Sequence, residues 1–154
     1  MKRLLISLVF IVSAITLLAM LQPRRGAPPP DVKYRELPFD LLRSWTYIEG
    51  QTPIPAEIRE WDGRPVQMTG FMMPLTQSKA ITEFVLVPYL FGCCFGGPPA
   101  PNHMVLVRLA GGATTPFLRV PIYARGTFHC GETWQDGHLI SLYRLEAQSI
   151  LSSR

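Results

Sequence analysis

The residues of this sequence that can do the most varied chemistry are its cysteines and histidines. Two adjacent cysteines, Cys93 and Cys94, lie in the segment FGCCFGGPPAPNH, which ends at His103. His129 and Cys130 are adjacent further along the chain. Thiolate and imidazole groups are ligands that zinc and copper favour in proteins. We therefore expect a transition-metal site, for zinc or copper, with these candidate ligands: Cys93, Cys94, His103, His129 and Cys130.

The same residues allow two other interpretations. No Cys-x-x-Cys pair is present, and adjacent residues of an extended segment point to opposite sides, so Cys93 and Cys94 do not readily ligate one ion together. A disulfide between Cys130 and either Cys93 or Cys94 would join two strands structurally. A thiol enzyme would need Cys94 with His103 or His129 as a base. No third, orienting residue is evident from the spacing, so an enzyme is disfavoured and no catalytic residue is assigned.

The elements that must position these residues are five predicted strands. Runs rich in β-branched and aromatic residues, bounded by Gly and Pro, predict them. Their ranges are Pro65–Leu75, Thr82–Leu90, His103–Leu109, Phe117–His129 and His138–Ile150. The candidate ligands follow the second strand, open the third and end the fourth, so one rim of a barrel would bring them together.

Glycines inside the strand patterns indicate how the sheet bends. Gly70 interrupts an alternating run in which Val66, Met68 and Met72 share one face, and Gly126 repeats this signal in the fourth strand. Short helices are expected within Phe39–Ile48 and Pro55–Gly63. We predict an all-β fold with one or two short helices, a small OB-like Greek-key barrel over residues 34–154, with a small sandwich as the alternative.

The N-terminal segment predicts a membrane location. Residues Leu4–Leu21 carry no charge and would form a helix about 27 Å long, which is enough to span a hydrocarbon core. Residues 1–21 are therefore a signal anchor or a signal peptide, and residues 22–33 are a Pro/Arg-rich linker. We expect a single-pass protein of the inner membrane, with its C-terminal domain on the outer (periplasmic or extracytoplasmic) side.

The charge distribution argues against a nucleic-acid partner. The formal net charge is +4, and four basic residues at the two ends of the apolar segment account for all of it: Lys2, Arg3, Arg24 and Arg25. The remaining eleven Lys and Arg residues balance the eleven Asp and Glu residues. The predicted domain is therefore formally neutral and has no basic excess for phosphates.

Three stretches of the chain resemble a bacterial domain-of-unknown-function family of small exported proteins. They are VQMTGFMMPL, TEFVLVPYLFGCCFGGPPAPNHMVLV and LISLYRLEA. The resemblance extends from about Pro55 to Ile150, and its most specific part is Val87–Asn102. The family pattern has a Cys followed shortly by a His, whereas this chain has Cys93-Cys94-Phe95-Gly96. A role of that His would have to pass to His103 here.

The resemblance implies an exported, OB-like single domain. Some relatives are encoded beside transition-metal or ABC-type transport systems. We therefore expect a membrane-anchored domain that binds a transition metal or assists a metal-transport partner. The first alternative is a non-catalytic interaction module of an envelope complex with a structural disulfide. The second alternative is the thiol enzyme.

Overall fold

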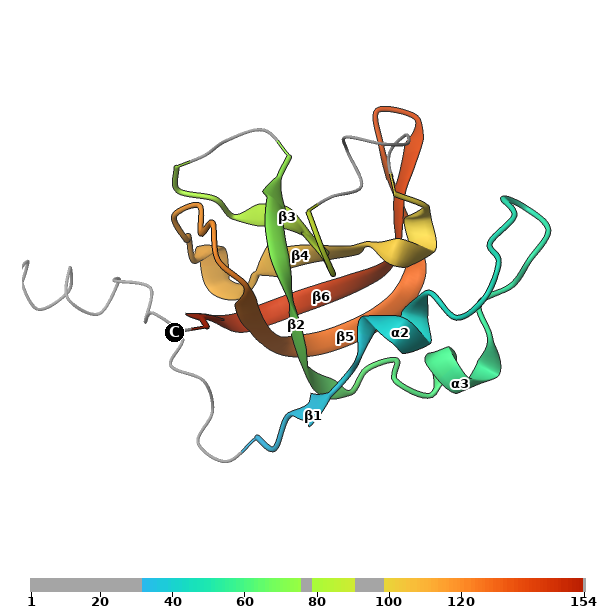
Figure 1. Cartoon of the computed structure of the whole chain (residues 1–154), viewed down its shortest axis with the longest axis horizontal. Coiled ribbons are helices and arrows are strands. Elements are labelled where there is room, and N and C mark those ends of the chain that lie inside the picture. The colour runs from blue at the N-terminus through green and yellow to red at the C-terminus, as the bar shows by residue number, and fades with distance from the viewer. Residues whose placement is uncertain (1–31, 76–78, 91–98, 154) are drawn as a thin grey trace, which may run out of the picture.

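The protein forms one six-stranded sheet with short helices, and this confirms the predicted β-rich fold (Figure 1). The computed structural model describes residues 32–75, 79–90 and 99–153. The predicted anchor and linker, and also Cys93 and Cys94, lie outside these residues. Within the described ranges, no helix has the length and apolar character needed to cross a membrane.

The strand pairings join five strands into a closed ring. The strands are β1 (Arg35–Glu36), β2 (Pro65–Pro74), β3 (Glu83–Val87), β4 (Val105–Leu109), β5 (Ile122–Gln135) and β6 (His138–Ser152). Their order is β1-β2-β3-β4-β6-β5, and an additional pairing of β2 with β5 closes the ring. The β4–β6 pair is parallel, whereas the other pairs within the ring are antiparallel. The short strand β1 pairs in parallel with the start of β2.

Strand β2 pairs first with β5 and then with β3 because it bends near Gly70. Residues up to Gly70 pair with β5, and residues from Phe71 onward pair with β3. A Cβ on Gly70 would lie 2.6 Å from the carbonyl oxygen of Val87. The predicted alternation is confirmed, since Val66, Met68 and Met72 are all buried.

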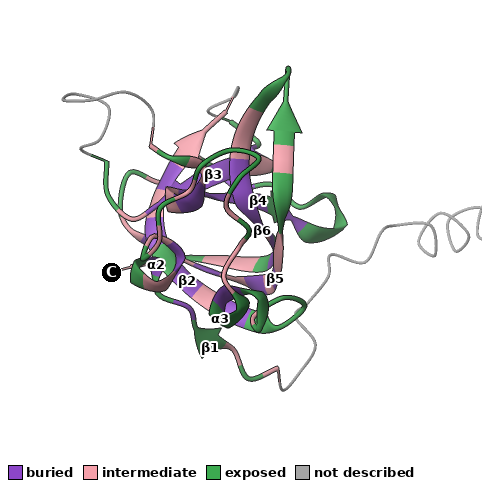
Figure 2. Cartoon of the chain, turned by 90° about the vertical axis from the view of Figure 1, so that its right-hand side faces the viewer, coloured by how far each residue is buried: buried purple, intermediate pink, exposed green. Residues whose placement is uncertain are grey.

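The interior of the ring holds the main apolar core, which the purple residues mark in Figure 2. The helices α2 (Phe39–Leu42) and α3 (Ala56–Arg59) contribute Phe39, Leu42 and Ile58 to this core. A smaller cluster of Val85, Val87, Met104 and Leu106 is separate from it. Because side chains alternate along a strand, this second cluster lies on the outer side of β3 and β4.

Buried hydrogen bonds fix α2 and the short turn η2 (Pro101–His103) against β6. The indole Nε1 of Trp45 donates to the hydroxyl of Tyr143 over 3.1 Å, and that hydroxyl donates to the carbonyl oxygen of Leu42. The side-chain amide of Asn102 donates to the carbonyl oxygen of Trp45 over 2.9 Å. These bonds set the positions of Arg43 and His103.

The predicted bounds of the fourth strand are wrong at both ends. This strand was expected over Phe117–His129, whereas β5 begins at Ile122 and continues to Gln135. Pro121 precedes its first residue, and the Asp136-Gly137 turn joins it to β6, with both residues at positive φ. His129 and Cys130 therefore lie inside a long hairpin strand. The end of this hairpin extends beyond the ring in Figure 1.

Candidate functional site

An apolar pocket of about 270 Å³ lies where β2 ends and β3 gives way to the following loop. Its walls come from four separate parts of the chain. They are Met72, Met73 and Pro74 of β2, Val87 of β3 with Tyr89 and Leu90 beyond it, Pro99, and Phe117. Met73 and Val87 also belong to the outer apolar cluster. The pocket is thus continuous with the buried apolar cluster on the outer side of β3 and β4.

The pocket is open to solvent on the side of Tyr89 and Leu90. Their exposed fractions are 47% and 45%, which are high values for large apolar side chains. Both residues come shortly after β3, whose own residues are buried except for the half-buried Glu83. Exposed large apolar side chains beside a cavity are typical of a binding site rather than of ordinary surface.

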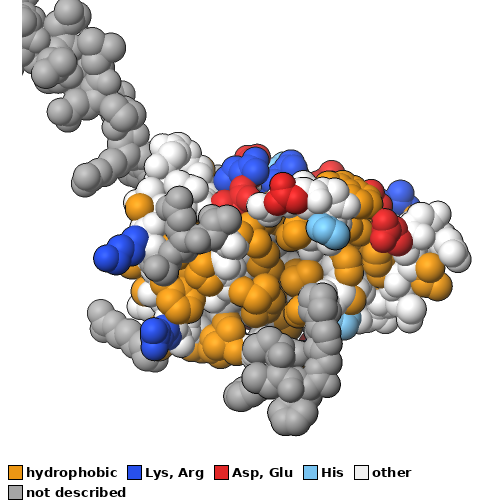
Figure 3. Space-filling model, turned by 90° about the horizontal axis from the view of Figure 1, so that it is seen from above, with side chains coloured by type: hydrophobic (Ala, Val, Ile, Leu, Met, Phe, Trp, Pro, Cys, Tyr) orange, Lys and Arg blue, Asp and Glu red, His pale blue; other side chains and the backbone are white. Residues whose placement is uncertain are grey.

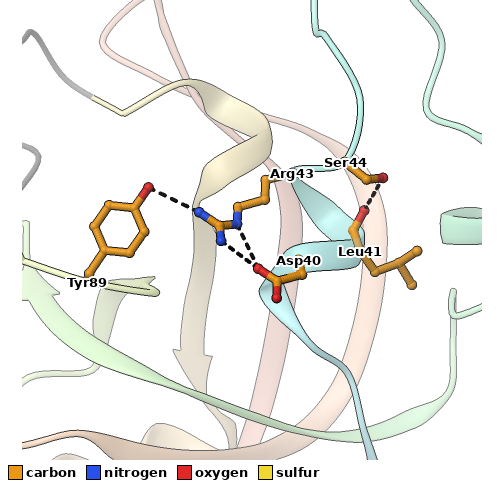
Figure 4. A network of polar contacts seen from close by, with 5 residues as sticks. All are labelled: Asp40, Leu41, Arg43, Ser44 and Tyr89. Atoms are coloured by element: carbon orange, nitrogen blue, oxygen red, sulfur yellow. Dashed lines mark hydrogen bonds and ion pairs between the residues drawn. The ribbon is translucent and has the colours of Figure 1, made fainter.

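Arg43 connects Tyr89 to α2, as Figure 4 shows. Its Nη1 donates to the Tyr89 hydroxyl over 3.2 Å, and the guanidinium lies 5.6 Å from the centre of the Tyr89 ring. Its Nε and Nη2 donate to Oδ1 of Asp40 over 3.0 and 2.6 Å. These hydrogen bonds, led by the one to Asp40, raise the pKa of Arg43. An Arg–Asp ion pair therefore lies beside the pocket.

His103 lies in η2, near Arg43. Partial burial, followed by the positive charge of Arg43, lowers the pKa of its imidazole. The ring is therefore neutral at pH 7. A neutral imidazole can bind a metal, but the adjacent guanidinium opposes the approach of a cation.

His129 and Cys130 both lie against Asp62, which follows α3. The backbone N–H of Cys130 donates to Oδ1 of Asp62 over 3.0 Å, and Nδ1 of His129 lies 3.6 Å from the same oxygen. The two side chains leave β5 on opposite sides because they are adjacent in a strand. Asp62 therefore contacts the imidazole and the Cys130 backbone, but not the Cys130 thiol.

The Cys130 thiol is half-buried, and it forms no disulfide within the part of the chain that the structure describes. Its Sγ donates a weak hydrogen bond to the carbonyl oxygen of Ile58 over 3.6 Å. Burial, and then the negative charge of Asp62, raises its pKa from 9.0 to about 11. Both predicted disulfide partners lie outside the described residues, so the disulfide stays a prediction.

The three predicted ligands that the structure describes lie in two different places. His129 and Cys130 share Asp62, whereas His103 lies near Arg43. In the described ranges, no group of three or more His, Cys, Asp or Glu residues is arranged to hold a metal ion. The pocket was not predicted, although Tyr89 and Leu90, shortly after a buried strand, were a usable signal.

Comparison with known proteins gives a family and a fold. Residues 46–152 match the model of a family described as "Protein of unknown function (DUF3299)". The crystal structure of a DUF3299 family protein from Pseudomonas aeruginosa superimposes with a TM-score of 0.59. It is 24% identical, and the match covers 80% of this chain and 98% of that one. The comparison with curated proteins gives no match.

Proposed function

We propose that this chain, which belongs to the bacterial DUF3299 family, is a non-catalytic interaction module of an envelope complex. The observation that carries this proposal is the open apolar pocket bounded by Met73, Val87, Tyr89 and Phe117. A pocket of about 270 Å³ accommodates one large side chain. Interfaces between proteins draw much of their affinity from such buried anchor side chains.

The strand order supports a binding role. A ring of five strands in the order β2-β3-β4-β6-β5, with β4 and β6 parallel, is the arrangement of an OB-like Greek-key barrel, and we infer that fold here. OB-folds bind ligands on the face of their second and third strands, which correspond to β3 and β4. The outer apolar cluster occupies that face.

The proposed setting is the periplasmic side of the inner membrane. Leu4–Leu21 would anchor the chain, and the Pro-rich linker would separate the domain from the bilayer. The formal neutrality of the chain beyond residue 30 agrees with a protein partner rather than a nucleic acid.

The state of Cys130 supports a structural role over a catalytic one. A thiol with a pKa of about 11 is almost entirely protonated at neutral pH, whereas a nucleophile needs the thiolate. Cys94 lies outside the described residues, so a thiol enzyme that uses it stays a prediction.

A photo-crosslinking residue at Tyr89 is expected to join the full-length chain to a protein partner in cells. A Met73→Gln substitution should reduce this adduct about fivefold or more, because it places a polar amide of similar size in the pocket wall. The same crosslinker at Ile48, which is 46% exposed and does not line the pocket, is the matched control. Equal yields at the two positions would contradict the proposal, and so would an adduct unaffected by Met73→Gln.

Transition-metal binding is a second candidate, and the geometry of His129 favours it. Metal-ligating histidines commonly present one ring nitrogen to a carboxylate and the other to the metal. Asp62 occupies the Nδ1 side of His129 and leaves Nε2 as the candidate ligand atom. A further ligand would be Cys93 or Cys94.

Metal analysis of the reduced full-length chain tests this second candidate. After reconstitution with zinc or copper and removal of excess ion, we expect about one equivalent per chain and a large loss in His129→Ala. Because His103 lies beside a cation, His103→Ala should retain the metal and serves as the control. Less than about a tenth of an equivalent in the unsubstituted chain would exclude the metal function.

A further inference from the structure

Two basic residues, Lys79 and Arg119, lie close in sequence to residues beside the pocket, and neither has an ion-pair partner among the described residues. A two-residue bridge joins Ile81 to Thr115 through two backbone hydrogen bonds of 2.9 Å. The bridge is antiparallel, so the chain before Ile81 and the chain after Thr115 leave it in the same direction. Lys79 and the pocket residue Phe117 are each two residues from the bridge, on that same side.

Arg119 adds a second cation to this side, two residues beyond Phe117. Lys79 and Arg119 are both exposed. Within residues 32–75, 79–90 and 99–153, the ion pairs join Arg43 to Asp40, Arg108 to Glu83 and His129 to Asp62. Lys79 and Arg119 therefore present uncompensated charge to solvent in this part of the chain.

Arg43 lies beside Tyr89 of the pocket wall, where its ion pair with Asp40 offsets its positive charge. It contacts the Tyr89 ring and hydroxyl, and its side chain is 35% exposed. In Figure 3 apolar side chains gather across the face, and its margin carries Lys or Arg side chains together with Asp or Glu side chains. An apolar pocket with a basic rim complements an apolar group that carries negative charge nearby.

The shape of the pocket favours a protein segment as its occupant. Its wall is open at Tyr89 and Leu90, and its volume suits one side chain, so it does not enclose a whole ligand. Drug-sized ligands are usually buried over most of their surface. A protein segment can instead insert a single anchor and leave its flanking residues at the rim.

We propose that the pocket binds an acidic segment of a partner protein, in which one bulky apolar residue is flanked by Asp or Glu. The inference rests on the proposed interaction function and adds the chemistry of the partner. The apolar residue occupies the pocket, while the carboxylates pair with Lys79 and Arg119. Exposed charge pairs of this kind raise the association rate and select the partner more than they add affinity.

Fluorescence anisotropy with synthetic peptides tests this proposal on the full-length chain in phosphatidylcholine nanodiscs. The probe is a short fluorescein-labelled peptide in which glutamates flank a single Phe. We expect it to bind about tenfold more tightly than matched peptides with Ala in place of Phe, or with Lys in place of Glu. Binding should weaken about threefold or more between about 50 and about 300 mM NaCl.

Charge-reversal variants test which basic residues cause the preference for the acidic peptide. The double variant Lys79→Glu/Arg119→Glu should lose about tenfold in affinity for the acidic peptide and gain affinity for the lysine peptide. The control Lys33→Glu/Arg64→Glu makes the same charge change near the opposite end of β2 and should bind as the unsubstituted chain does. Melting curves of both variants verify their folding.

The outcomes separate this inference from the proposed function. If Met73→Gln abolishes peptide binding but the Lys79/Arg119 variant binds normally, the basic rim is irrelevant and the inference is overturned, while the pocket function stands. If decanoate displaces the peptide at lower concentration than the unlabelled peptide does, the pocket is a lipid site and both are overturned. If no Phe peptide binds while crosslinking at Tyr89 still depends on Met73, only the acidic character of the partner is refuted.

Discussion

A Gly126→Ala variant is expected to lose about 3 kcal/mol or more of its free energy of unfolding. The added Cβ would clash with the carbonyl oxygen of Glu146 and lie 2.7 Å from the Cα of Ala147. Both contacts are with backbone, so no side-chain rotation relieves them. The strands themselves would have to separate.

The location of Gly126 makes that separation costly. Gly126 pairs with Val66 of β2 and, on its other side, with Ala147 of β6. A register shift between β5 and β6 occurs at Arg125/Gly126, where the close approach is needed. Displacing β5 here disturbs the pairing that closes the ring and the longest hairpin at the same time.

Urea unfolding of the full-length chain in mild detergent, followed by tryptophan fluorescence, measures this loss. The control is Thr127→Ala, which shortens a half-buried side chain at the next position and should cost less than about 1 kcal/mol. A Gly126→Ala variant as stable as this control would show that β5 and β6 do not approach each other this closely. A loss in Gly126→Ala alone supports the closed ring.

Much of the sheet was predictable because its signals are local. The alternation of Val66, Met68 and Met72 and the interrupting Gly70 depend on neighbours along one strand, and the structure confirms the alternation. The resemblance to a bacterial family of unknown function is also confirmed. The Asp136-Gly137 turn was an equally local signal that was missed, and this error misplaced His129 and Cys130 at a strand end.

The pocket was not predictable in the same way. Met73, the Val87–Tyr89 stretch and Phe117 lie far apart in the sequence, and each is compatible with ordinary core packing when considered alone. The bend of β2 and the Ile81–Thr115 bridge bring them together. Such long-range packing is decided by the whole fold rather than by any one segment. The division of the candidate ligands between Arg43 and Asp62 has the same origin.

Cys130 is expected to react with iodoacetamide about 100-fold more slowly at pH 8 than an unperturbed thiol does. Its pKa of about 11 is two units above the ordinary 9.0, so the reactive thiolate is about 100-fold rarer. A full-length Cys93→Ser/Cys94→Ser variant leaves Cys130 as the single thiol, and mass spectrometry follows its alkylation. Unfolding the chain in guanidinium chloride should restore the ordinary rate and provides the control.

The pH dependence of this reaction distinguishes the possible roles of Cys130. The folded state binds the thiol proton more tightly than the unfolded state, so this stabilisation is complete below about pH 9 and is lost as pH rises towards 11. The alkylation rate should therefore keep rising to about pH 11, while stability declines over the same interval. A rate that levels off near pH 8 would mean a depressed pKa, as an activated nucleophile requires, and would contradict a structural role. If zinc instead protects Cys130 from alkylation at neutral pH, a metal displaces the thiol proton. That result would favour the metal function over the interaction module.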